Sequence, residues 1–249
     1  MDTPRLVAHR GYAAHYPENS LRAMREAVAA GARCLELDVQ LSADRVPVLL
    51  HDADLQRVAG RPGRVHELGW SELRRWHIGE PARFGQRFAD EPLPALAQLV
   101  SWLQTQPGVC LFVELKSESI EHFGADTVLQ RVLAVLQPVL ARCALISFHA
   151  EALARARHYT QRPIGWVIRR WEPGARETAA ALRPEFLICN HSKIRDALWP
   201  GPWQWFLYEI THPEQAWQWW RRGARWLESM DIASLLQDPR LAQEPCDGL

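Results

Sequence analysis

The sequence has no excess of charge of either sign. Lys and Arg number 29, Asp and Glu also number 29, and the formal net charge at pH 7 is zero. A protein without net charge has no long-range field that draws it to nucleic acid or to an anionic membrane. We therefore expect no nucleic acid among its partners.

Long hydrophobic runs are also missing, although hydrophobic residues make up 47% of the chain. No apolar run approaches the roughly 20 residues of a membrane-spanning helix. The first residues, Met1 to Pro4, lack the basic and apolar regions of a secretory signal. These absences predict a cytoplasmic protein with no integral membrane segment.

The cysteines show no pairing pattern. They are odd in number and widely scattered, and no two form a C-x-x-C motif, so the sequence indicates neither a zinc site nor a disulfide framework. Most lie in or beside apolar runs, where a thiol behaves as a small buried hydrophobe. We expect free thiols at all five positions, Cys34, Cys110, Cys143, Cys189 and Cys246.

What the sequence does contain is an alternation of short apolar runs with longer amphipathic ones. The short runs predict strands at Leu6–Arg10, Cys34–Leu41, Val46–His51, Val109–Lys116, Cys143–Phe148, Ile164–Arg169, Phe186–Asn190, Trp205–Ile210 and Ala224–Glu228. The longer runs predict helices at Ser20–Ala30, Leu93–Gln104, Thr127–Leu140, Ala150–His158, Gly174–Leu182 and Pro213–Arg222. Strands that alternate with helices favour a parallel sheet.

Only residues 42–45 separate the second predicted strand from the third, too few for a parallel crossover. These two strands should form an antiparallel hairpin, which leaves eight strands in β/α order. Eight such units in about 250 residues predict a TIM (β/α)8 barrel. We expect one domain over residues 1–249, with a hairpin after strand 2. An open doubly wound sheet is the alternative, but no G-x-G-x-x-G motif follows the first strand.

The hairpin also predicts the position of a histidine. A turn at Ala43 and Asp44 sets Val48 opposite Val39. This register brings His51 back beside Glu36.

Polar residues collect at the C-terminal ends of the predicted strands, where TIM barrels carry their chemistry. The sets are His9-Arg10-Gly11, Glu36-x-Asp38, His51-Asp52 and Glu114-Leu115-Lys116. Glu36 and Asp38 share one face of a strand because side chains alternate. Two buried anions side by side repel each other unless a cation lies between them.

Each residue type in this group has a role that fits the others. Three carboxylates without a Cys or His ligand pattern suit Mg²⁺ or Ca²⁺. Arg10 and Lys116 can bind an anionic group such as phosphate, and the two histidines can move protons. Together these residues predict metal-assisted cleavage of a phosphodiester.

Any one of these residues taken alone is more often structural than catalytic. A histidine at a strand end is usually solvated, and Lys116 could pair with Glu118. Their joint placement at successive strand ends is what favours a functional site.

Several stretches match motifs of one known family. "HRG" followed by "PENS" matches H-R-G…P-E-N-[ST], and "ELDVQLSADRVPVLLHD" matches E-x-D-V-x-x-[ST]-x-D-G-x-P-V-x-x-H-D. "RFADEPLPALAQLV", "FVELK" and "LISFHAEAL" match later segments. On these motifs the sequence resembles the glycerophosphodiester phosphodiesterases.

The resemblance implies a TIM barrel with a small insertion after His51-Asp52, here a short form at residues 53–92. It also implies roles for particular residues. His9 and His51 would be the acid/base pair, and Glu36, Asp38 and Glu114 would bind one divalent cation, usually Mg²⁺ or Ca²⁺. Arg10 and Lys116 would bind the phosphate. Glu18 and Asn19 would support the site from beneath.

The sequence departs from the family pattern in two places. Arg45 stands where a turn glycine is usual, which is unfavourable if its φ is positive. In the C-terminal third, "LYEITHPEQA" replaces W-T-x-N-x-P-x-E and "GARWLESMD" replaces G-V-D-G-I-x-T-D. The wall that contacts the alcohol is therefore altered, and we expect Trp205 and Tyr208 to reach the pocket.

Tryptophans are concentrated in the same third of the chain. Seven lie between residues 199 and 226, at Trp199, Trp203, Trp205, Trp217, Trp219, Trp220 and Trp226. We expect them to pack the last two β/α units, and a surface patch for lipid or a partner is the alternative.

Three functions are compatible with the sequence. The first is metal-dependent hydrolysis of a glycerophosphodiester to sn-glycerol 3-phosphate and an alcohol. The second is the same chemistry on a lysophospholipid, and the third is a catalytically weak barrel that binds a phosphorylated ligand. Both histidines and all three carboxylates are present, which disfavours the third. Whether the protein forms a homodimer is left open.

Overall fold

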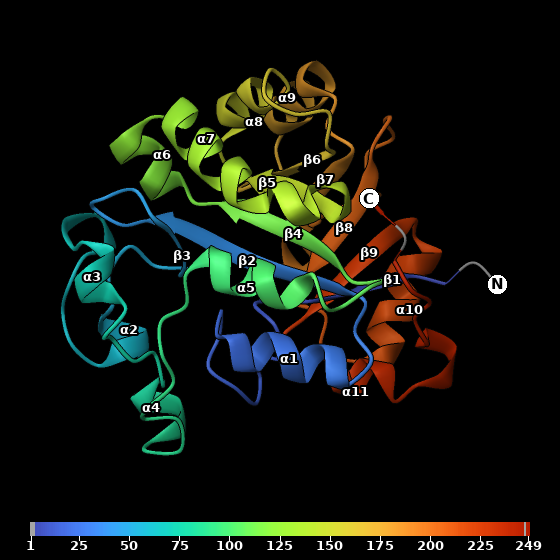
Figure 1. The fold of residues 1–249 in the computed structure, drawn as a ribbon. Helices are drawn as coiled ribbons and strands as arrows, with labels where there is room; N and C mark the ends of the chain where they lie inside the picture. The colour runs from blue at the N-terminus through green and yellow to red at the C-terminus, as the bar shows by residue number, and fades with distance from the viewer. Residues whose placement is uncertain (1–2, 247) are drawn as a thin grey trace.

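The computed structural model describes residues 3–246 and 248–249, and within them nine strands form one sheet (Figure 1). The strands are β1 (Arg5–Ala8), β2 (Cys34–Leu41), β3 (Pro47–Leu49), β4 (Cys110–Leu115), β5 (Cys143–Ser147), β6 (Ile164–Val167), β7 (Phe186–Asn190), β8 (Gln204–Tyr208) and β9 (Ala224–Ser229). β1 pairs with both β2 and β9, so eight parallel strands close into a barrel. β3 pairs antiparallel with β2. The predicted TIM barrel with its hairpin is confirmed.

Helices follow most of the strands and cover the outside of the barrel (Figure 1). They are α1 (Leu21–Ala29), α5 (Leu96–Leu103), α6 (Ser117–Phe123), α7 (Ala125–Leu136), α8 (Ala150–Ala156), α9 (Pro173–Leu182), α10 (Pro213–Arg221) and α11 (Ile232–Leu236). Short 3₁₀ helices lie at Val65–Glu67, Gln137–Arg142, His191–Lys193 and Pro239–Leu241. Among the helices in the described part of the chain, none is both long enough and apolar enough to cross a membrane.

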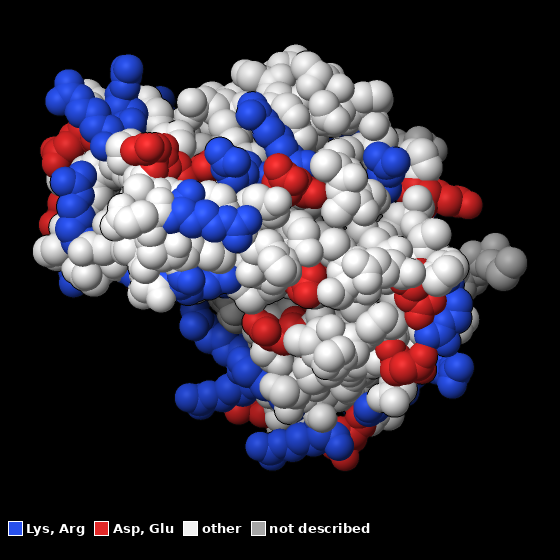
Figure 2. Space-filling model, turned by 90° about the horizontal axis from the view of Figure 1, so that it is seen from below, with Lys and Arg blue, Asp and Glu red and all other residues white. Residues whose placement is uncertain are grey.

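Residues 53–92 carry three short helices, α2 (Gln56–Ala59), α3 (Trp70–Leu73) and α4 (Pro81–Phe84). This insertion has a small hydrophobic cluster of its own, which includes Leu55, Val65 and Trp76. Figure 2 shows the molecule from below, with many Lys and Arg side chains on its left. The helices α2–α4 lie on the same side in Figure 1.

The alternation of side chains along the strands divides the core into two layers. One layer lies inside the barrel, where Phe112, Phe206 and Trp226 pack edge to face or stacked. The other lies between the strands and the helices and contains residues such as Leu37 and Leu145. A filled interior is typical of this fold and leaves the strand ends as the place for a site.

The loop after β1 is fixed by one glycine. Gly11 has a φ of 80°, and a Cβ atom there would lie 2.6 Å from the carbonyl carbon of Ala23 in α1. α1 begins with Ser20, whose hydroxyl accepts a hydrogen bond from the Ala23 N–H. The close contact between this loop and α1 holds the preceding residues, His9 and Arg10, at the barrel mouth.

The predicted hairpin register is wrong by one residue. Val39 pairs with Leu49, not Val48, and the Leu50 N–H donates to the Asp38 carbonyl. Continuing this register places His51 opposite Leu37 instead of Glu36. The register differs because the turn between β2 and β3 is one residue longer than predicted. Arg45, with a φ of 62°, is the additional residue of this turn.

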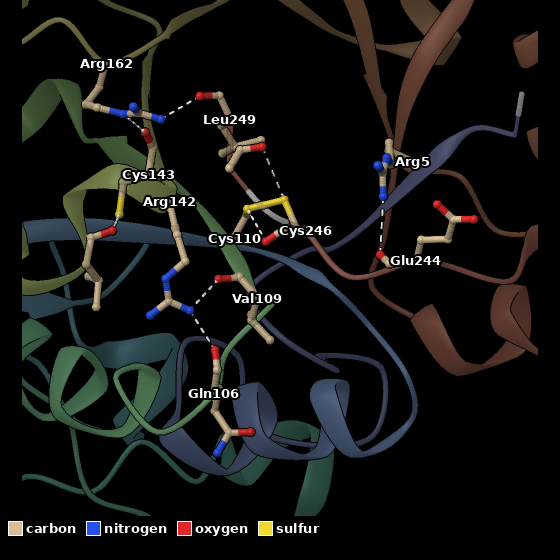
Figure 3. The surroundings of a disulfide bond; sticks show 12 residues. Arg5, Gln106, Val109, Cys110, Arg142, Cys143, Arg162, Glu244, Cys246 and Leu249 are labelled. Carbon is tan, nitrogen blue, oxygen red and sulfur yellow. Dashed lines mark hydrogen bonds between the residues drawn. A yellow bond between two sulfur atoms is a disulfide. The ribbon is translucent and has the colours of Figure 1, made fainter.

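The prediction that all five thiols are free is also wrong. Cys110 and Cys246 form a disulfide across 136 residues of sequence (Figure 3). Cys110 begins β4 at the end of the barrel opposite the mouth, and the Cys246 N–H donates to the Gly108 carbonyl. Closure of the barrel brings these two residues together, which sequence spacing alone does not indicate. The other three cysteines are buried and free.

The tryptophans of the C-terminal third lie mostly in the packed core. Trp203, Trp205, Trp219 and Trp226 are buried, and Trp199 and Trp217 pack against the outer hydrophobic layer. Trp205 donates its indole N–H to the Trp199 carbonyl and lies near the Trp171 ring. Packing of the last β/α units accounts for these six residues, and Trp220 is half-buried with its ring edge-on to that of Trp217.

The disulfide should contribute measurably to stability. Because it closes a long loop, Cys246→Ala should lower the free energy of unfolding by about 2–4 kcal/mol. The measurement is denaturant unfolding with and without a thiol reductant. The reductant should destabilise the wild-type protein and have no further effect on the variant. Equal stability of the oxidised wild type and the variant would contradict a stabilising disulfide.

Candidate active site

Buried carboxylates gather at the C-terminal mouth of the barrel. Glu36 and Asp38 come from β2 and Glu114 from β4, with Asp38 paired to Glu114 in the sheet register. All three are buried, and one ligand oxygen from each lies within 4.8 Å of the others. The structure thus brings together the three carboxylates that the sequence singled out.

Asp38 is surrounded by groups that favour its ionised form. Lys116 Nζ lies 3.3 Å from Oδ1, and Arg10 Nε lies 3.1 Å from Oδ2. The Asn19 amide donates to Oδ2 at 2.9 Å, and its oxygen accepts the Asp38 N–H. Burial alone would raise the pKa of Asp38, but Lys116 and Arg10 outweigh it and hold the pKa well below its usual range.

Two of these partners hold an unusual backbone conformation. Arg10 has a φ of 54° and Asn19 a φ of 57°, in the left-handed region that residues with a Cβ atom rarely adopt. Both side chains reach Asp38 from this conformation. Backbone strain concentrated around one buried carboxylate is a feature of functional sites.

Glu36 has no comparable set of cations. Burial raises the pKa of Glu36 well above its usual value, and the neighbouring Asp38 and Glu228 raise it further. Its Oε2 accepts the Arg10 backbone N–H at 3.1 Å. Within the described residues, its sole ion-pair partner is His9, which is charged only when protonated.

This arrangement fits a divalent cation. The donors are carboxylate oxygens without sulfur, which is the set that Mg²⁺ and Ca²⁺ prefer. A positive ion among them would offset the repulsion that disfavours the ionised form of Glu36. The donor chemistry and the lack of charge compensation therefore both point to a metal site.

The two cations singled out from the sequence differ in their surroundings. Lys116 follows β4, and its ammonium lies 2.9 Å from Glu114 Oε1. Burial alone would lower the pKa of Lys116, but Asp38 and Glu114 raise it above its usual value, so the ammonium stays charged. Arg10 donates to Glu18 at 3.0 Å as well as approaching Asp38, so its guanidinium lies between two carboxylates.

Glu18 connects the mouth of the barrel to the insertion. Arg57 of α2 donates two hydrogen bonds to its carboxylate, at 2.8 and 2.7 Å. The Glu18 N–H donates to Glu80, which also binds Arg83. The insertion therefore helps to hold Glu18, and through it Arg10, in place.

His9 directly follows β1 and is buried. Its Nε2 lies 3.9 Å from Glu36 Oε2 and 3.9 Å from Glu228 Oε2. Burial lowers the pKa of His9 well below 6.5, and the nearby Arg10 lowers it further. The imidazole is therefore neutral near pH 7 and can accept a proton.

His51 lies just beyond β3 and is partly exposed. Its Nδ1 lies 2.6 Å from Asp52 Oδ1, and this interaction lowers the pKa of the Asp52 carboxyl. Asp52 also accepts a hydrogen bond from Arg57. Asp52 fixes the orientation of the ring, so Nε2 is the nitrogen left to exchange a proton with a substrate.

The structure separates the two aromatic residues predicted to reach the pocket. Tyr208 ends β8 on the inner face, and its ring centroid lies 6.2 Å from that of His9. Trp205 lies on the opposite face, in the layer between β8 and the helices. The prediction for Trp205 failed because residues three apart on a strand point to opposite sides.

Sequence reasoning missed one acidic residue of the mouth. Glu228 is the penultimate residue of β9, on the same face as Trp226, which lies inside the barrel, and it is 4% exposed. The strand alternation used for the other carboxylates would have found it. Comparison with the family motif concealed it, because Glu228 stands at a position where that motif fixes no residue type.

A family model bears on this site. The model of the glycerophosphoryl diester phosphodiesterase family matches residues 9–202. The chain belongs to this family.

Individual relatives of the family agree with this assignment. Glycerophosphodiester phosphodiesterase 1 of Bos taurus is 28% identical over 169 residues, which cover 68% of this chain and 50% of the bovine protein. A glycerophosphodiester phosphodiesterase of Bacillus altitudinis is 28% identical over 150 residues, 60% of each chain. The chain thus matches about half to three fifths of the length of these relatives.

Solved structures of other phosphodiesterases share the fold. A phosphodiesterase of Oleispira antarctica, in complex with sn-glycerol-3-phosphate, superposes with a TM-score of 0.83, covering 94% of this chain and 96% of that one at 23% identity. A glycerophosphodiester phosphodiesterase of Agrobacterium tumefaciens gives a TM-score of 0.74 at 20% identity, covering 93% and 99%. At these identities the likeness establishes the barrel alone.

Metal binding at the three carboxylates should stabilise the protein. Mg²⁺ or Ca²⁺ at a hundred times its dissociation constant should add about 2.7 kcal/mol to the free energy of unfolding. Glu36→Gln should lose most of this gain, and without metal it should be at least as stable as wild type because a buried like charge is removed. Thermal unfolding across a metal titration measures both effects.

The exposed Glu118, at the start of α6, provides the matched control. Glu118→Gln should keep the full metal-induced stabilisation. An undiminished response in Glu36→Gln would show that the ion binds elsewhere.

Proposed function

We propose that this protein hydrolyses glycerophosphodiesters to sn-glycerol 3-phosphate and an alcohol, with Mg²⁺ or Ca²⁺ as cofactor. The observation that carries the proposal is the buried group of Glu36, Asp38 and Glu114 beside Lys116 and His9, with His51 close enough to Asp38 to interact with it electrostatically. Family membership supports it, as does the product bound to the Oleispira antarctica protein of the same fold. We also propose that this activity resides in a single domain that spans the chain.

The three carboxylates would hold the cation, and their burial would limit the access of water to it. When bound, a divalent ion supplies charge neutralisation to the phosphoryl oxygens. Lys116 would bind a phosphate oxygen, because its ammonium has three donors and only two carboxylate partners in Asp38 and Glu114. Arg10 would add positive charge beneath that oxygen.

The two histidines differ in a way that assigns their roles. The neutral His9 is suited to remove a proton from the nucleophile. His51, held by Asp52, is suited to protonate the oxygen of the leaving alcohol. Proton transfer in these two directions is what an in-line displacement at phosphorus requires.

The nucleophile in this proposal is the 2-hydroxyl of the substrate's own glycerol. His9 takes its proton, the hydroxyl oxygen bonds to phosphorus, and the bond from phosphorus to the alcohol breaks as His51 donates a proton. Water then opens the resulting cyclic phosphate. An intramolecular nucleophile gains effective concentration over water, and direct attack by water is the alternative route.

The substrate is small in this proposal. The tryptophans of the C-terminal third are engaged in packing, which gives no support to a lysophospholipid as the preferred substrate. A barrel that only binds phosphate is disfavoured, because both histidines, the carboxylates and Lys116 lie at one mouth. A cytoplasmic location stays a prediction of the sequence.

The proton-transfer roles predict large effects on turnover. His9→Ala and His51→Ala should each lower kcat about 100-fold or more at saturating metal, because each removes one proton-transfer group. The measurement is release of glycerol 3-phosphate from glycerophosphocholine and glycerophosphoethanolamine. His158→Ala, at an exposed histidine beyond α8, should turn over as wild type. Near-wild-type kcat in either site variant would show that the pair is misassigned.

The choice of nucleophile can be tested with a substrate that lacks the 2-hydroxyl. If the cyclic route operates, this analogue should bind but be cleaved at least about 100-fold more slowly, because the intramolecular advantage is lost. Single-turnover assays at saturating analogue separate binding from cleavage. Cleavage at a near-normal rate would instead establish direct attack by water.

A further inference from the structure

Glu228 is a buried carboxylate that forms no ion pair with Lys or Arg among the described residues. It is 4% exposed, and its Oε1 has no hydrogen-bond partner among the described residues. In that part of the chain its sole ion-pair partner is His9, which carries no charge when neutral. A buried carboxylate in such surroundings is strongly disfavoured unless a cation accompanies it.

The atoms around Glu228 have the spacing of a metal site. His9 Nε2 lies 3.9 Å from Glu228 Oε2 and 3.9 Å from Glu36 Oε2, and one ligand atom from each of the three residues lies within 4.8 Å of the others. Two ligand atoms bound to one ion at about 2.1 Å are separated by at most about 4.2 Å. Only small side-chain shifts are needed for all three to bind one ion.

The position of His9 is compatible with this role. Its Nδ1 is buried and has no hydrogen-bond partner among the described residues, so no acceptor dictates the tautomer. A neutral imidazole that binds an ion through Nε2 carries its proton on Nδ1. The ring can therefore present an Nε2 lone pair to the space between Glu36 and Glu228.

This group is distinct from the three-carboxylate group. Ligand atoms of Glu228 and His9 do not cluster with those of Asp38 and Glu114, and Glu36 alone belongs to both groups. The donor chemistry differs as well, because an imidazole nitrogen favours transition metals such as Zn²⁺ or Cu²⁺ over Mg²⁺ and Ca²⁺.

We propose that His9, Glu36 and Glu228 form a second cation site, for a divalent transition metal such as Zn²⁺, which shares Glu36 with the first site. An ion in this second site occupies the His9 Nε2 lone pair. That nitrogen can then no longer take a proton from the nucleophile. Binding of a transition metal therefore inhibits the enzyme that contains Mg²⁺. This inhibition rests on the proposed function, but the binding of the transition metal does not depend on it.

The binding test is equilibrium dialysis against Zn²⁺ in saturating Mg²⁺, followed by elemental analysis of both metals. Wild-type protein should retain its Mg²⁺ and take up about one additional Zn²⁺ per chain. Glu228→Gln should lose the additional ion and keep the Mg²⁺. Glu209→Gln, at a half-buried acid that follows β8 and belongs to neither group, is the matched control and should bind both.

Thermal unfolding of each variant checks that loss of Zn²⁺ is not loss of fold. Removal of an uncompensated buried charge should leave Glu228→Gln at least as stable as wild type in the absence of Zn²⁺. Glu228→Asp, which keeps the charge on a shorter side chain, should bind Zn²⁺ more weakly than wild type but still detectably.

The inhibition test uses hydrolysis of glycerophosphocholine with Mg²⁺, each variant being compared with its own activity without Zn²⁺. The Zn²⁺ concentration that halves activity should rise at least about tenfold in Glu228→Gln and stay unchanged in Glu209→Gln. Zn²⁺ uptake that is equal in wild type and Glu228→Gln, or that displaces Mg²⁺ one for one, would overturn the second site. Zn²⁺ uptake that depends on Glu228 without inhibition would preserve the site and contradict the proton-accepting role of His9.

Discussion

The mouth of the barrel is organised around the repulsion among carboxylates that are buried together. Glu36, Asp38, Glu114 and Glu228 converge there from three strands, and burial by itself disfavours the ionised form of each. Asp38 is compensated by Lys116 and Arg10, and Glu114 by Lys116. The remaining negative charge is what the proposed cation would offset.

Compensation of Asp38 shapes much of the surrounding chain. Arg10 and Asn19 reach it from left-handed backbone conformations, and Glu18 holds Arg10 from the other side. Arg57 then ties Glu18 to the insertion. Residues distant in sequence are thus arranged about one carboxylate, and the insertion forms part of the scaffold that holds them.

Periodicity in the sequence predicted the barrel because the pattern is local. A strand that is buried on both faces is apolar along its whole length, so an apolar run indicates a strand. The limits of β2 and β7 agree with the predicted runs. The helices α6 and α11 were not predicted. α6 begins directly after Lys116 with the polar run "SESIEHF", in which apolar periodicity is weak.

Features that depend on contacts between distant residues were harder to predict. The hairpin register slipped because Arg45 takes a conformation that its residue type does not suggest. The disulfide joins residues 136 apart, which only the closed barrel brings together. Placement at predicted strand ends singled out His9, Glu36, Asp38, His51, Glu114 and Lys116 as candidates, and the family motifs agreed. The same motifs drew attention away from Glu228, whose position in β9 follows from strand alternation alone.

The central claim is that the carboxylate group and its cation make this barrel a phosphodiesterase. ³¹P nuclear magnetic resonance of glycerophosphocholine incubated with the protein tests it most directly, because substrate, cyclic phosphate and glycerol 3-phosphate give separate signals. With Mg²⁺ or Ca²⁺ the substrate signal should be replaced by that of glycerol 3-phosphate, and with a chelator it should persist. Conversion that continues at the same rate in the chelator, or no conversion of any glycerophosphodiester with either metal, would contradict the account.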